Sequence, residues 1–186
     1  MRAPDQIRIG MAALEANSGL DRTASDLTAL GRRVGAGRRG AILRGEFLGH
    51  ALHPLLTDFP LGCWLASGLL DLSFDGRFKS ASQRLVGLGC LTVVPTAMSG
   101  VADYAVIDDQ RSKRVGVAHA TGNGAVALAY VLSWVSRRRG HHGLGVALGI
   151  TGGLGAWVTG YFGGHLSLAR HEGSGERGLD LPGPDT

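Results

Sequence analysis

The sequence predicts an all-α fold: an integral membrane bundle of four transmembrane helices with both termini on the same side. Four apolar stretches have about the ~20 residues that cross ~30 Å of hydrocarbon. None shows the polar face that repeats every three or four residues in the helices of a soluble bundle. The mean hydropathy is only +0.10, because polar segments at both ends of the chain dilute these stretches.

The positions of the spans follow from the apolar stretches. We expect them at residues 55–72, 85–102, 115–135 and 143–168. The loops between them are short, so neighbouring helices must run antiparallel. Four spans then leave both tails on one side of the membrane, which we call the near side, and the first and third loops on the far side.

The remaining segments complete the domain organisation. Residues 1–39 are polar and rich in arginine, and we expect a partly mobile tail with short helices at 11–16 and 27–34. Residues 40–171 form the four-span domain, preceded by an amphipathic segment at 41–48 that suits the membrane surface. Residues 172–186 are polar, with Gly and Pro, and are expected to be a flexible C-terminal tail.

The basic charge favours a lipid partner over a nucleic acid. The net charge is +4, but the arginines cluster beside the apolar stretches, where anionic headgroups and the positive-inside rule explain them. No basic surface interleaved with aromatic residues is visible, so nucleic acid is excluded as a partner. More basic residues flank the near side than the far side, which favours cytoplasmic termini.

Ionisable residues inside the spans gather near one membrane face. Each span carries one of them close to its near-side end: Asp58, Asp103, His119 and His165. His50 and His53 precede the first span at nearly the same level, and Asn123 and Tyr161 lie one helical turn deeper. Such residues are costly in lipid, so a functional role is the default hypothesis.

Three interpretations of this polar layer remain open. It can be an interhelical hydrogen-bond network that only holds the bundle together. It can be a cofactor site, in which His119 and His165, then His53, bind haem axially or bind a transition metal. It can also be a proton or solute path, for which His and Asp chains are typical. The candidate metal ligands are His50, His53, Asp58, Asp103, His119 and His165, with Asn123, Tyr161 and Gly164 in support.

Four ordered motifs carry a resemblance to a known family. The segments GEFLGHALHPLLTDFPLGCW, SGVADY, HATGN and GYFGGHLSLAR closely resemble the bacterial membrane family called domain of unknown function 2231, over roughly residues 40–171. The resemblance implies a four-span membrane domain without an assigned reaction, in the bacterial cytoplasmic (inner) membrane. The family's marked positions correspond to His50, His53, Pro54, Asp58, Pro60, Asp103, His119, Asn123, Gly164 and His165.

Some relatives carry a C-terminal Rieske iron–sulfur domain, which implies a redox connection for the membrane part. This chain has no Cys/His cluster of the Rieske type, so we expect a redox partner to be a separate protein. No nucleophile–base pair or phosphate-binding loop is visible, so we expect no enzyme activity from the chain alone. The partner, the cofactor and a homo-oligomeric state stay open at this point.

Overall fold

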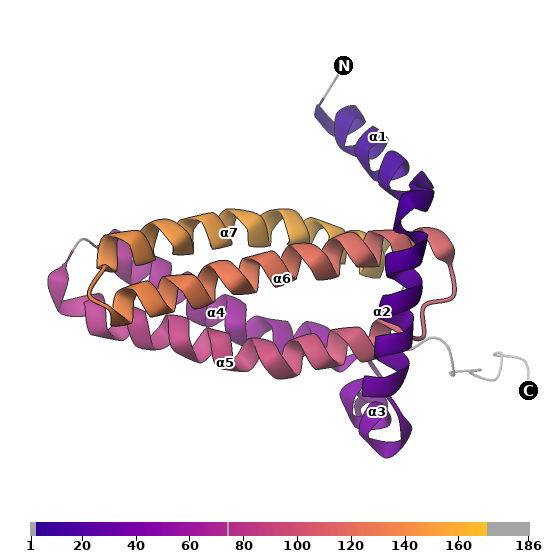
Figure 1. Ribbon diagram of the computed structural model, residues 1–186, viewed down its shortest axis with the longest axis horizontal. Coiled ribbons are helices and arrows are strands. Elements are labelled where there is room, and N and C mark those ends of the chain that lie inside the picture. Colours follow the sequence, from indigo (N-terminus) through magenta and orange to yellow (C-terminus); the bar gives the residue numbers. More distant parts are fainter. Residues whose placement is uncertain (1–2, 74, 171–186) are drawn as a thin grey trace, which may run out of the picture.

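The computed structural model describes residues 3–73 and 75–170, and within them every regular element is helical. Four long helices form an antiparallel bundle (Figure 1): α4 Leu52–Leu72, α5 Lys79–Tyr104, α6 Gln110–Arg138 and α7 His142–Gly164. A π-helical turn, η4 His165–Ala169, continues α7. All four helices are long and apolar enough to cross a membrane, which confirms the predicted all-α membrane fold.

Helices α4, α5 and α6 are longer than the apolar stretches that predicted them, and α7 covers the fourth stretch only together with η4. Hydropathy locates the part of a helix that lies in hydrocarbon, whereas a helix continues to the next capping residue. For α6 that residue is Asp109, whose side chain accepts a hydrogen bond from the Ser112 backbone N–H at 2.8 Å. The predicted third span began at residue 115, six residues after this cap (115 minus 109).

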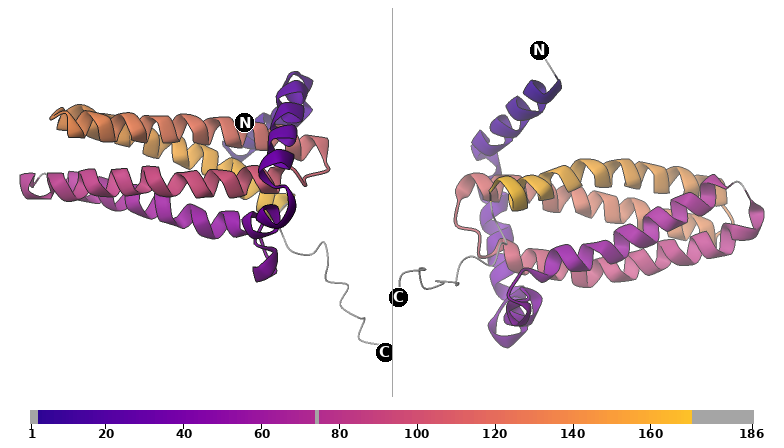
Figure 2. Two further views of the ribbon diagram at one scale, coloured as in Figure 1. Left: turned by 60° about the horizontal axis from the view of Figure 1, so that its bottom comes forward. Right: turned by 180° about the vertical axis from the view of Figure 1, so that it is seen from behind.

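The bundle consists of two hairpins, α4–α5 and α6–α7, that lie side by side (Figure 2). Within each hairpin a large aromatic ring packs on a glycine of the facing helix: Trp64 on Gly89, and Tyr130 on Gly152. These two rings also stack on each other at the centre of the bundle, with centroids 3.9 Å apart. Glycine therefore brings helices close together, as the small-residue composition of membrane interfaces predicts.

The outer surface of the bundle is apolar. Large side chains such as Leu91, Leu154 and Trp157 are more than two-thirds exposed, and Trp157 is 84% exposed. No more than 28% of the most apolar stretch of any candidate span is buried inside the protein. Such a surface needs a lipid environment, because a soluble protein rarely exposes so much continuous apolar area.

Three N-terminal helices follow one another at the near end of the bundle, where α4 begins and α7 ends: α1 Ala3–Ala16, α2 Asp21–Val34 and α3 Gly37–Leu43. Helix α2 lies across this end, and α1 extends away from it (Figure 1). Helices α1 and α2 are longer than the helices expected at 11–16 and 27–34. The buried face of α2 is a stripe of small residues, Ala24, Thr28 and Gly31, rather than the large apolar residues that make a helix easy to recognise.

Tertiary contacts hold α2 against the bundle. Ala24 is fully buried against Tyr104, Ile107 and Val117, so this contact joins α2 to both α5 and α6. Gly31 lies so close to the backbone of α5 that a side chain there would collide with it. The predicted C-terminal tail, residues 172–186, lies outside the described residues.

Candidate functional site

Two of the predicted histidines face each other across the two hairpins at the near end. His53 lies in the first turn of α4, and His119 lies in the third turn of α6. Their ring centroids are 6.3 Å apart, and the ring planes are nearly perpendicular, at 86°. The structure thus pairs His119 with His53, whereas the sequence favoured His165 as its partner.

Hydrogen bonds fix the tautomer of both rings. Nδ1 of His53 lies 2.9 Å from the Thr96 carbonyl oxygen, and Nδ1 of His119 lies 2.9 Å from the Thr159 carbonyl oxygen. A carbonyl oxygen only accepts, so each Nδ1 must carry the proton and donate it. In the neutral rings each Nε2 therefore keeps its lone pair, which is the arrangement typical of metal-binding histidines.

Asn123 completes a closed ring of hydrogen bonds around His119. Its amide nitrogen donates to Nε2 of His119 at 3.0 Å, and its amide oxygen accepts from the Thr159 hydroxyl at 2.6 Å. A ligand on Nε2 of His119 would have to displace this amide. Asn123, which the sequence predicted as a supporting residue, thus contacts the one ring nitrogen of His119 that is not bonded to Thr159.

The other candidate residues lie apart from this pair. His50 and Asp58 are exposed, and Asp103 is half-buried at the end of α5, within reach of the charge on Arg44. Tyr161 is 47% exposed and contacts Phe162. Gly164 has no neighbour within 4 Å of the position of a Cβ, while the preceding glycine, Gly163, lies directly against the His119 ring.

His165 binds the N-terminal helices. Its Nε2 lies 2.8 Å from a carboxylate oxygen of Glu15, which also forms an ion pair with Arg170. The hydrogen bond from Arg170 lowers the pKa of the Glu15 carboxyl, against the opposing effect of burial. Nearby, hydrogen bonds from Arg114 and Gln110 lower the pKa of Asp21 to about 2. This part of the predicted layer joins α1 and α2 to the bundle.

The six predicted metal ligands thus do not form one cluster. Among residues 3–73 and 75–170, no three His, Cys, Asp or Glu side chains lie where together they could hold a metal ion. Depth along the helix axis placed these residues at one level, but their rotation about the axis differs. His53 and Asp58 illustrate this difference in rotation. Asp58 is exposed whereas His53 is partly buried, so the two side chains lie on different sides of α4.

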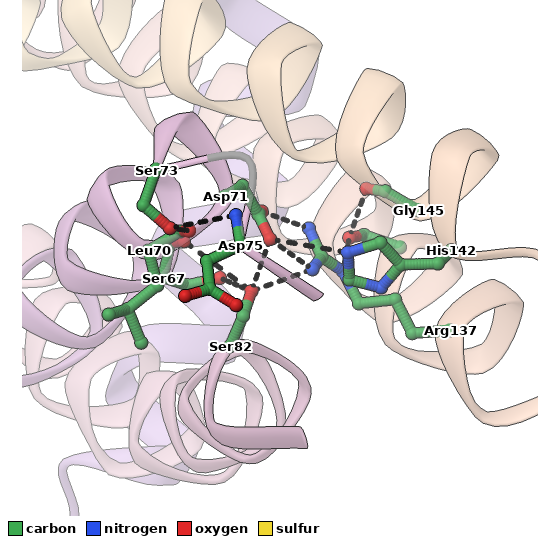
Figure 3. A network of polar contacts seen from close by, with 10 residues as sticks. Ser67, Leu70, Asp71, Ser73, Asp75, Ser82, Arg137, His142 and Gly145 are labelled. Atoms are coloured by element: carbon green, nitrogen blue, oxygen red, sulfur yellow. Dashed lines mark hydrogen bonds and ion pairs between the residues drawn. The ribbon is translucent and has the colours of Figure 1, made fainter. Parts of the chain in front are cut away.

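The far end of the bundle holds a buried ion pair that is not among the predicted site residues (Figure 3). The two terminal guanidinium nitrogens of Arg137 donate to the Asp71 carboxylate, at 3.0 and 2.7 Å. The side chains are only 1% and 6% exposed. Ser82 donates to Asp71 and accepts from Arg137, both at 2.7 Å, so the pair is closely surrounded by hydrogen-bonding groups.

The network extends to both hairpins. Ser133 accepts a hydrogen bond from Arg137 and donates to the Gly145 carbonyl oxygen at 2.6 Å. His142, one residue before the predicted fourth span, begins α7, and its Nε2 lies 3.5 Å from a carboxylate oxygen of Asp71. A sequence signal existed, because Asp71 falls inside the predicted first span and an ionised group there requires a partner.

The folded arrangement defines a class: an integral membrane protein with four candidate spans and a polar cluster at each end of the bundle. Comparison with known families then identifies the chain. A family model described as "Predicted membrane protein (DUF2231)" matches residues 49–172, so the chain belongs to this family of membrane proteins of unknown function. No curated protein and no solved structure matches it.

Proposed function

We propose that this protein binds a redox-active cofactor, haem or a transition metal, between His53 and His119. One observation carries the proposal: both Nδ1–H groups donate to helix carbonyls, so each Nε2 keeps a lone pair, in rings whose centroids are 6.3 Å apart. The lone pair of His119 Nε2 accepts from the Asn123 amide, which a ligand would displace. Backbone carbonyls that orient histidine ligands in this way are typical outer-shell partners of metal sites.

The number of ligands favours haem. Structural zinc sites take four protein ligands and catalytic ones take three, whereas the porphyrin supplies four nitrogens to haem iron and leaves only axial positions to the protein. His53 and His119 would fill these two positions. Helical bundles commonly build cofactor sites from side chains on facing helices, as here from α4 and α6.

The lipid-facing surface and the charge pattern support a proposal for where the site lies in the cell. The protein lies in the bacterial inner membrane, with the near end and both termini on the cytoplasmic side, where most basic residues flank the bundle. Electrons would pass to or from a separate redox partner protein at the near end, or between subunits of a homo-oligomer. A reporter enzyme fused to the C-terminus tests the orientation, because periplasmic activity would contradict it.

Spectroscopy of the purified protein tests the cofactor. Protein isolated from membranes should show haem absorption bands that shift on reduction, or a stoichiometric metal by elemental analysis. His53→Ala and His119→Ala should each change or abolish the signal, whereas His50→Ala, at an exposed position of the same region, should leave it intact. If protein expressed with haem and metal supplied shows no haem band and contains no bound metal, the proposal is refuted.

The alternative is a structural or partner-anchoring membrane protein without a cofactor. The closed hydrogen-bond ring of His119, Asn123 and Thr159 favours it, because this ring by itself joins α6 to α7. On this alternative, Asn123→Ala lowers thermal stability and nothing else. On the cofactor proposal, the same substitution frees Nε2 of His119 and should strengthen cofactor binding.

A further inference from the structure

The two hairpins share an unusual contact at the near end. In α4–α5, Nδ1 of His53 donates to the carbonyl of Thr96, and in α6–α7, Nδ1 of His119 donates to the carbonyl of Thr159. In both cases the histidine is on the first helix, the threonine is on the second, and the distance is 2.9 Å. Two unrelated helix pairs have no reason to share this arrangement.

Each histidine ring also rests on a glycine one turn beyond its threonine. A Cβ at Gly100 would lie 2.7 Å from Cε1 of His53, and a Cβ at Gly163 would lie 2.8 Å from Cε1 of His119. In each hairpin, therefore, an imidazole ring lies against a threonine carbonyl oxygen and a glycine of the second helix, which we call its glycine cradle.

The correspondence continues along the whole length of the helices. In the middle, Trp64 on Gly89 matches Tyr130 on Gly152, and at the far end Ser67 and Ser133 each bond to the second helix of its own hairpin. The first helices match at an offset of 66 positions (119 minus 53), and the second helices match at an offset of 63 (163 minus 100). The matched pairs are His53/His119, Trp64/Tyr130, Ser67/Ser133, Asp71/Arg137, Ser82/Gly145, Gly89/Gly152, Thr96/Thr159 and Gly100/Gly163.

Three of these pairs also touch each other across the hairpins. His53 faces His119 at the near end, the Trp64 ring stacks on Tyr130 in the middle, and Asp71 binds Arg137 at the far end. A residue contacts its own counterpart only on a two-fold axis. Because the three contacts lie at successive depths, the axis runs along the bundle, and the two first helices run parallel.

We infer that the four-span domain is an internal repeat of one helical hairpin about this axis, and that His53 and His119 are equivalent half-sites for one ligand on it. Parallel repeats related by an axis along the membrane normal are an established way to build membrane proteins. The ligand part rests on the proposed function, whereas the repeat does not. Such an axis would suit a centre that two equivalent histidine nitrogens, one from His53 and one from His119, could hold, as haem iron could be held.

An exchange of charges tests the repeat without any ligand. Arg137 packs on Gly145 of its own hairpin, while Asp71 accepts a hydrogen bond from Ser82 of its own hairpin. If the positions are equivalent, D71R/R137D should be less stable than the quadruple variant D71R/S82G/R137D/G145S, which moves each charge together with its neighbour. The quadruple variant should recover most of the loss in unfolding temperature that D71R alone causes in detergent.

A mismatched exchange is the control. D71R/S82G/R137D/G149S places the serine one turn away, at a glycine that also lies near Arg137, and should not recover stability. If the mismatched variant recovers as much, or the matched one gains nothing over the double variant, the repeat is refuted. W64Y/Y130W is a second exchange without charges, and it tests the repeat even if the charge variants misfold. A large loss of stability in W64Y/Y130W also contradicts the repeat.

Haem reconstitution of variants at the two glycines under the histidine rings tests the ligand part of the inference. G100A and G163A should weaken haem retention to the same degree, at least several-fold, while G164A, where a Cβ meets nothing within 4 Å, should not change it. A large difference between G100A and G163A would overturn the equivalence of the half-sites. If no variant retains haem but the matched charge exchange recovers stability, the proposed function and the ligand are refuted while the repeat stands.

Discussion

The buried ion pair at the far end permits a quantitative prediction. Asp71→Asn removes the negative charge but keeps the shape of the side chain. The Arg137 guanidinium, only 1% exposed, then retains hydrogen bonds to Ser82 and Ser133 without any counter-charge. Removing one partner of a buried ion pair typically costs about 3–5 kcal/mol.

This cost should be visible as a large thermal shift. For a chain of this size each kcal/mol lowers the unfolding midpoint by roughly 2–4 °C, so Asp71→Asn should lower it by roughly 6–20 °C. The assay is thermal unfolding of the detergent-purified protein, followed by circular dichroism or by a thiol-reactive dye at Cys63 and Cys90. Asp71→Leu combined with Arg137→Met should return most of the loss, because it removes both charges together.

A matched control separates burial from mere loss of a carboxylate. Asp75 also pairs with an arginine at the far end, but that partner, Arg77, is 85% exposed. Asp75→Asn should therefore change the midpoint little, since exposed ion pairs contribute little stability. If Asp71→Asn is as mild as Asp75→Asn, the pair is not a buried determinant of stability and the reasoning fails.

Two further predictions concern the N-terminal helices. Gly31→Ala should loosen α2, because a Cβ there would collide with the Val101 carbonyl oxygen, and proteolysis of residues 3–34 should become faster; Gly10→Ala, with open space around it, should not have this effect. The pKa of Asp21 in the folded protein is about 2, below the usual 3.8. Its ion pair with Arg114 therefore contributes its full stabilisation above pH 3.8, and this stabilisation is lost as the pH falls towards 2. Pepsin cleavage of α1 and α2 should rise over this interval, and a constant rate from pH 4 to 2 would contradict the assignment.

The sequence predicts the membrane bundle well because hydrocarbon thickness imposes a length that few other folds require. The candidate site is predicted only in part, for a geometric reason. Depth along a helix follows from counting residues, so His53, His119 and His165 were placed at the correct end. Which residues meet depends on rotation about each helix axis, and α1 adds Glu15 as a partner for His165 that no span contains.

The N-terminal helices illustrate a different limit. The stripe of Ala24, Thr28 and Gly31 has little hydrophobic signal in the sequence. Its role in close helix packing becomes visible only in the fold, where α5 and α6 provide a surface that small residues can approach closely. Asp71 shows the opposite case, in which the signal was present. An aspartate inside an apolar span requires a partner, and the basic residues at the end of the third span were the available ones.

The three contacts along the proposed axis differ in a way that bears on function. A dimer of identical hairpins would place Asp against Asp or Arg against Arg at the far end, which burial forbids, and a single chain avoids this by carrying Asp71 opposite Arg137. The middle contact has also diverged, to Trp64 on Tyr130. Of these three contacts only the near-end one, His53 and His119, pairs identical residues. Each ring is already held by its own hairpin through Nδ1, so the two histidines gain little from each other. A shared ligand between them gives a physical reason for both to be histidine.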